Sequence, residues 1–140
     1  MMKYLLSACL IAQFSMALAC IIPTGNEPST ILFQKDKAPK SFIIKTKKFK
    51  IKIDKQANGT YLYQSWGAQS PITAKPSLVI KNGTVEYETQ GDRYYYNFKN
   101  KGYDYTVVKE FGGAKYMYTL MVSDKNKNTV LTEDGEIVNK

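Results

Sequence analysis

The chain has 140 residues, a formal net charge of +8 and no histidine. The lack of histidine excludes Ser-His-Asp and Cys-His catalytic arrangements and histidine-containing zinc or copper sites. Arg93 is the only arginine among the twenty basic residues, so lysine carries the positive charge. Lysine offers a hydrated point charge rather than the rigid fork that recognises phosphate or carboxylate shape. Such a surface favours solubility, or loose attraction to anionic lipid, polysaccharide or an acidic protein.

The first 19 residues have the pattern of an export signal. Lys3 precedes a mainly apolar run over residues 4–18, and Ala17 and Ala19 form a small-x-small cleavage site. The apolar run is too short for a comfortable membrane span. We interpret residues 1–19 as a signal peptide and expect an exported, periplasmic protein.

Cys20 directly follows the cleavage site and resembles the modified cysteine of a lipobox. Cys9 would leave with the leader, so the mature chain would hold one cysteine and no internal disulfide. An unpaired thiol is a liability in an oxidising compartment, whereas lipidation would use it. We predict that Cys20 is lipidated and anchors the protein at the outer membrane; a soluble exported protein with a free thiol is the alternative.

Residues 20–40 contain several prolines and little periodicity, which indicates a lipid-anchored tether with a possible first short strand at Ile31–Phe33. From 41 to 140 the pattern predicts a single β domain. Phe49, Ile51 and Ile53 alternate with lysines, as in a strand with one apolar face. Phe42 and Ile44 have the opposite register, so we expect a bulge or bend between Lys45 and Lys48.

The remaining strands are bounded by turn residues. Further strands are predicted over residues 61–66, 78–80, 85–89, 94–98, 103–108, 116–122 and 129–131, with turns at Asn58-Gly59, Asn82-Gly83, Gly91-Asp92, 99–102, 112–113 and 124–128. These turns are too short for crossovers, so neighbouring strands must pair antiparallel. The sequence predicts an all-β fold, an antiparallel meander of about eight strands forming a small barrel or sandwich.

Tyrosine and lysine provide the candidate binding surface. Of three consecutive tyrosines, Tyr94 and Tyr96 share one strand face and Tyr95 points the opposite way. The lysine run from 45 to 55 is explained either as charge protection of an edge strand or as an anion-facing patch. The candidate surface consists of one indole, one phenol and three ammonium groups: Trp66, Tyr95, Lys48, Lys50 and Lys52.

No residue set in the chain predicts an enzyme, a metal site or a cofactor. Glu86 and Glu88 lie two residues apart on a predicted strand, a spacing that paired glycosidic carboxylates can have, but alternation puts both outside. Gly112-Gly113 lacks the Lys-Ser/Thr of a phosphate loop. Basic strands with aromatics resemble single-strand nucleic-acid platforms, but export argues against such a partner.

Three stretches carry a family resemblance: GTYLYQSWG from Gly59, KPSLVIKNGTVEYETQG from Lys75 and YNFKNKGYDYTVV from Tyr96. They resemble a group of small secreted or lipid-anchored bacterial β proteins, which brings no activity with it. More loosely, a lipid-anchored eight-stranded barrel is similar to bacterial inhibitors of host C-type lysozyme. Neither resemblance assigns a site residue.

Together these features predict a non-enzymatic envelope protein that binds another protein, as an inhibitor or immunity protein does. Three alternatives remain open: a β-barrel that holds a small apolar ligand, a binder of an anionic envelope polysaccharide, and a glycan hydrolase that uses Glu86 and Glu88.

Overall fold

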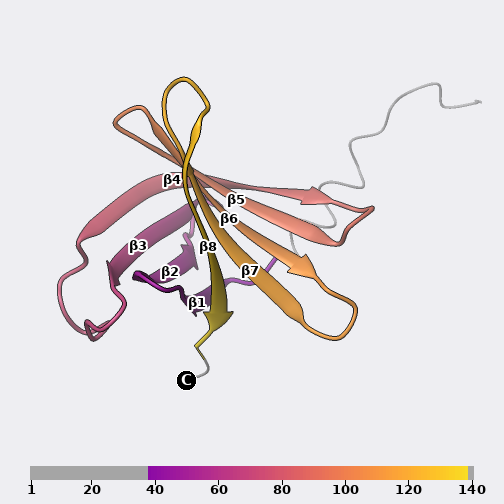
Figure 1. The fold of residues 1–140 in the computed structure, drawn as a ribbon, viewed down its shortest axis with the longest axis horizontal. Helices are drawn as coiled ribbons and strands as arrows, with labels where there is room; N and C mark the ends of the chain where they lie inside the picture. The colour runs from indigo at the N-terminus through magenta and orange to yellow at the C-terminus, as the bar shows by residue number, and fades with distance from the viewer. Residues whose placement is uncertain (1–37, 139–140) are drawn as a thin grey trace, which may run out of the picture.

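The structure is a computed structural model that describes residues 38–138. It contains eight strands: β1 (Ser41–Lys45), β2 (Phe49–Lys55), β3 (Tyr61–Gly67), β4 (Leu78–Glu88), β5 (Arg93–Asn100), β6 (Tyr103–Phe111), β7 (Tyr116–Ser123) and β8 (Thr129–Ile137). Each strand pairs antiparallel with the next, and β8 pairs back with β1, so the sheet closes into a barrel (Figure 1). The predicted all-β meander is confirmed, as a barrel rather than a sandwich.

Several predictions concern residues before Ala38. The signal peptide, Cys20 and the short strand at Ile31–Phe33 lie outside the described residues. Ala38 itself is 4% exposed and packs into the core. The packed domain therefore includes at least this residue of the predicted tether.

Alternation along each strand fills the barrel interior with apolar side chains. Tyr94 and Tyr96 are buried while Tyr95 between them is not, as predicted. The Tyr96 ring lies 5.0 Å from Phe42 and 5.2 Å from Tyr61, centroid to centroid, both edge-on. The largest fully buried side chains are Tyr61, Tyr63, Tyr96, Phe98, Ile44, Ile51, Ile53, Leu120 and Val107.

The prediction of a hairpin turn at Asn82-Gly83 is wrong. Both residues lie inside β4, where the pairing with β3 shifts register between Tyr61 and Tyr63. Asn82 adopts a positive φ of 61°, so the Asn-Gly pair forms a bulge that bends the strand instead of reversing it. The two short strands predicted on either side are therefore one strand of 11 residues.

The opposed registers around Lys45–Lys48 have a simple cause. Residues 46–48 form the turn of the β1–β2 hairpin, closed by a hydrogen bond from Thr46 N to Phe49 O at 2.8 Å. The bend that we expected is thus a chain reversal. Because β2 pairs with both β1 and β3, the lysine run does not protect a sheet edge, and that explanation is wrong.

The meander gives the barrel two different ends. Loops 46–48, 68–77, 101–102 and 124–128 leave at one end, which we call the open end. Loops 56–60, 89–92 and 112–115 leave at the other, which we call the closed end. In Figure 1 the tips of the β5–β6 and β7–β8 hairpins project together at the top of the view.

The seam between β1 and β8 is the shortest pairing in the barrel. It consists of two residue pairs, Ile44 with Ile137 and Lys45 with Glu136, whereas β6 and β7 share eight pairs. The Glu133 side chain supports this seam, because its carboxylate accepts a hydrogen bond from Lys48 N at 3.1 Å across the β1–β2 turn. That side chain is only 8% exposed.

Candidate functional site

Of the three predicted lysines, Lys50 and Lys52 lie on β2 and Lys48 lies in the β1–β2 turn, and each has a partner in the protein. Lys48 lies 3.7 Å from Glu133, and Lys52 lies 2.9 Å from Asp54. Lys50 donates to the backbone oxygen of Ser70 at 2.8 Å and so holds the β3–β4 loop. These ammonium groups are partly neutralised or hold a loop in place, so they are less available to bind an external anion.

Trp66 is covered rather than displayed. It is 3% exposed, and its indole N–H donates to Ala74 O at 2.8 Å. The β3–β4 loop folds back over this part of the sheet, and Trp66 shares a hollow of about 390 Å³ with Ile72 and Ile43. The loop cover was invisible in the sequence because alternation alone puts Trp66 on the outside.

Tyr95 lies apart from the other predicted surface residues. It belongs to β5, which is separated from β2 by two intervening strands around the barrel. Its hydroxyl donates to Glu88 at 2.8 Å, and Arg93 bridges Glu88 and Glu110. The predicted set therefore forms no single surface, and Glu88 is engaged in this network.

A cavity of about 310 Å³ opens inside the barrel at its open end. Aromatic and aliphatic side chains from six strands form most of its wall, with serines at two positions. The lining residues are Phe49, Tyr63, Ser65, Trp66, Gly67, Ser77, Leu78, Tyr105, Leu120, Val122 and Leu131. This is the composition of a small-molecule site, apolar walls with few polar groups, at the small end of the usual range of about 300–1,000 Å³.

Ser65 and Tyr63 contribute to the polarity of the cavity. Ser65 is an inward-facing serine that is 5% exposed. Burial raises the pKa of Tyr63 to about 12, and a hydrogen bond with Ser65 opposes that rise only in part. Both hydroxyls are therefore neutral at physiological pH, and the cavity offers hydrogen bonds but no charge.

The closed end is filled by a cluster around Lys109. This side chain is 7% exposed, and its ammonium lies 3.8 Å from the Tyr116 ring centroid and 5.2 Å from that of Tyr94. Desolvation lowers the pKa of Lys109, while the charge of Asp92 opposes that fall. Asp92 accepts from Tyr87 and Tyr116, each at 3.1 Å. The barrel is thus a cup, plugged at one end and hollow at the other.

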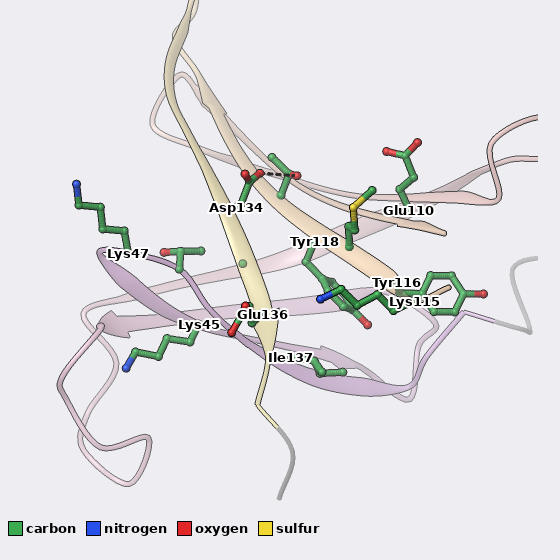
Figure 2. A pocket seen from close by; sticks show the side chains of 13 residues that line it. Lys45, Lys47, Glu110, Lys115, Tyr116, Tyr118, Asp134, Glu136 and Ile137 are labelled. Carbon is green, nitrogen blue, oxygen red and sulfur yellow. Dashed lines mark hydrogen bonds between the residues drawn. The ribbon is translucent and has the colours of Figure 1, made fainter. Parts of the chain in front are cut away.

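A third feature is a surface groove of about 890 Å³ where β8 leaves β7 to reach β1. The β7–β8 pairing ends at Tyr118 and Gly135, so within residues 38–138 no strand pairs with Tyr116–Met117 on that side. Figure 2 shows Lys45 and Lys47 on one side of β8 and Tyr116, Tyr118 and Lys115 on the other. The groove is therefore mixed in charge and open.

The sequence left a barrel that holds an apolar ligand open as an alternative, but it did not predict the set of residues that lines the cavity, nor the burial of Lys109. The cavity exists because the inward side chains at the open end do not fill the barrel interior. No local sequence pattern predicts how side chains from different strands fill that space. Lys109 did carry a signal: it follows Val107 at the inward period of β6, where a charge is unusual. Among residues 38–138, no group of three or more acidic or cysteine side chains gathers to hold a metal ion.

Comparison with known proteins adds no identity: no family model, no curated protein and no solved structure matches this chain. In the part of the chain described, no helix is long and apolar enough to cross a membrane.

Proposed function

We propose that this protein is an exported binding protein whose barrel takes up a small, largely apolar ligand at its open end. One observation carries the proposal: within residues 38–138, an apolar cavity of about 310 Å³ lies at the open end, while Lys109 and its aromatic neighbours fill the other end. An eight-stranded barrel is just wide enough to be filled by side chains or to hold one small ligand. Here the interior is filled on the closed side only.

The lining restricts the ligand class. Phe49, Tyr105 and Leu131 favour an aromatic or aliphatic body, because apolar contact is the main source of affinity in such a cavity. Ser65 and Ser77 favour one uncharged hydrogen-bonding group. A charged group seated deep in the cavity would be desolvated without a counter-ion, so we expect it to be rejected.

Trp66 gives a direct test, because it is the only tryptophan of the chain and it borders the cavity. Titration with N-phenylnaphthylamine, an uncharged aromatic probe, should quench Trp66 fluorescence in a saturable way. Leu131→Phe should fill the cavity and weaken the probe by about tenfold or more. Val130→Phe is the matched control, because Val130 adjoins Leu131 on β8 but is 55% exposed.

Two results would count against the ligand cavity. One is probe binding that does not saturate. The other is equal weakening by Leu131→Phe and Val130→Phe.

Export and anchoring are part of the proposal and rest on residues 1–20. Labelling cells with palmitate should mark the wild-type protein and should fail with Cys20→Ala. Unlabelled wild-type protein, or a labelled Cys20→Ala variant, would remove the lipid anchor and leave a soluble exported protein.

A protein partner remains the second candidate, favoured by the groove beside β8. Met117 and Ile137 are 48% and 47% exposed there, next to the unpaired backbone of β7. An extended segment of a partner could add to that backbone as a strand. Proteins recovered from envelope extract by wild type, and not by Met117→Asp, would support this candidate.

A further inference from the structure

Lysines are concentrated on the loops of the open end. Those four loops carry Lys47, Lys48, Lys75, Lys101, Lys125 and Lys127, with Asp124 as their only acidic residue. The three loops of the closed end carry one lysine, Lys115, and one acid, Asp92. Among the loops of the described chain, positive charge is therefore concentrated at the open end.

Most of these open-end lysines are free to meet an external anion. Lys48 pairs with Glu133 and Lys127 with Asp104. Within residues 38–138 the other four form no ion pair, and all are exposed: Lys47, Lys75, Lys101 and Lys125.

Exposed apolar side chains accompany the lysines. Ile72 lies within the β3–β4 loop, and Val79, Tyr103 and Val130 each lie within two residues of an open-end loop. Their exposed fractions are between 42% and 55%. Single exposed apolar residues are ordinary, but these four accompany lysine-rich loops at the same barrel end as the cavity, and we call this set of loops and residues the amphipathic rim.

Two hairpin tips form a basic hollow within this rim. Lys101, Tyr103 and Lys125, on the β5–β6 and β7–β8 tips, line a hollow of about 320 Å³. Asp124 also lines the hollow, but its carboxylate accepts hydrogen bonds from Asn126 N at 2.8 Å and Asn128 N at 2.9 Å. The Asp124 carboxylate is therefore held by backbone N–H groups of its own turn, and the ammonium groups of Lys101 and Lys125 are left for a ligand.

We propose that the open end docks onto an anionic lipid bilayer. Lys101 and Lys125 flank a phosphate of an anionic headgroup, and Tyr103 and Val130 enter the interface between headgroups and acyl chains. Lysine suits this partner because charge attraction to a fluid anionic surface needs no fixed fork geometry. At the closed end the exposed Phe111 packs against Tyr116, whose ring contacts the buried Lys109. The three loops of that end carry one lysine, Lys115, so fewer loop ammonium groups are available there than at the open end.

This docking orients the cavity mouth toward the lipid surface, which would supply apolar ligands to it. It goes beyond the proposed function, since the outer rim can bind lipid whether or not the cavity is occupied. The two can therefore fail separately.

The test is sedimentation of the full chain with vesicles, in a Cys20→Ala background so that no acyl chain holds the protein. Vesicles of phosphatidylcholine alone are compared with equimolar phosphatidylcholine and phosphatidylglycerol. Lys101→Gln with Lys125→Gln should weaken partitioning to the anionic vesicles roughly 30-fold, since each lysine near such a surface contributes about fivefold. Lys40→Gln with Lys115→Gln removes the same charge away from the open end and should leave partitioning within about twofold of the starting chain.

A further variant tests insertion. Tyr103→Ser should weaken binding to anionic vesicles even at high salt, where charge attraction is screened. Equal losses from the two lysine pairs, or equal partitioning to both vesicle types, would overturn the proposal. Quenching of Trp66 by N-phenylnaphthylamine without vesicles reports on the cavity alone and distinguishes failure of docking from failure of ligand binding.

Discussion

At the scale of single residues, Tyr96 combines good apolar packing of its ring with a buried hydroxyl. The Tyr96 hydroxyl is buried, and in the described part of the chain it has no hydrogen-bond partner. Burial raises the pKa of Tyr96 strongly, as expected for a hydroxyl removed from water. Its ring, by contrast, packs edge-on against two aromatic neighbours. The ring is the useful part of this residue for stability.

Tyr96→Phe is therefore expected to stabilise the protein by about 1 kcal/mol, because it deletes an unsatisfied buried hydroxyl and keeps the ring. Tyr63→Phe is the matched comparison. It removes a hydroxyl that is bonded to Ser65 and should be neutral or destabilising. Urea unfolding measures both, and a Tyr96→Phe variant less stable than wild type would contradict the prediction.

Gly83 is required for its lack of a side chain. A Cβ built there would overlap the Phe98 ring, which packs over the β4 bulge. Gly83→Ala should cost about 1–3 kcal/mol through overpacking. Adding Phe98→Leu should recover part of that loss in a double-mutant cycle, whereas strictly additive losses would show that the two sites do not interact.

At the scale of elements, the barrel depends on one short joint. Two residue pairs connect β8 with β1, and the buried carboxylate of Glu133 supports them by bonding the β1–β2 turn. Burial opposes ionisation of Glu133, yet bonds with Thr46 and Lys48 hold its pKa below the ordinary value of 4.5. The ionised form thus belongs to the closed barrel.

Acid should weaken this joint. A carboxyl with a lowered folded pKa stabilises the protein above its unfolded pKa, and that contribution is lost as the pH falls through the folded pKa. Glu133→Gln should lose about 1–2 kcal/mol at neutral pH and show a flatter decline in stability below pH 4.5 than wild type. Stability would be measured by urea titration at each pH. Parallel stability–pH curves for the two proteins would show that groups other than Glu133 cause the loss of stability in acid.

At the scale of the whole molecule, the barrel holds its tyrosines neutral. Burial raises the pKa of Tyr63 and of Tyr94 to about 12, from 10.0 in the unfolded chain. Groups with a raised folded pKa stabilise the protein fully below the unfolded pKa and lose that contribution as the pH rises through the folded value. The barrel should therefore unfold cooperatively at alkaline pH.

Stability is expected to fall steadily between pH 10 and pH 12, with tyrosinate absorbance and loss of sheet dichroism rising together. Lys109 acts in the opposite direction, because its lowered pKa favours the folded state as that ammonium is deprotonated. Lys109→Met should accordingly steepen the alkaline decline. Tyrosine ionisation complete well before unfolding would contradict the buried interior described here.

The sequence by itself determined the strand content, the antiparallel order and the inward placement of Tyr94 and Tyr96. These follow from side-chain alternation and short turns, which are local properties of the chain. It also predicted export, from the signal-peptide pattern of residues 1–19, which lie outside the described residues. The tertiary structure decided the rest: that Asn82-Gly83 bends a strand, that a loop covers Trp66, that β2 is no edge, and that one end is plugged by Lys109 while the other stays hollow. Those outcomes depend on side chains brought together from distant strands, and only closure of the barrel determines which of them meet.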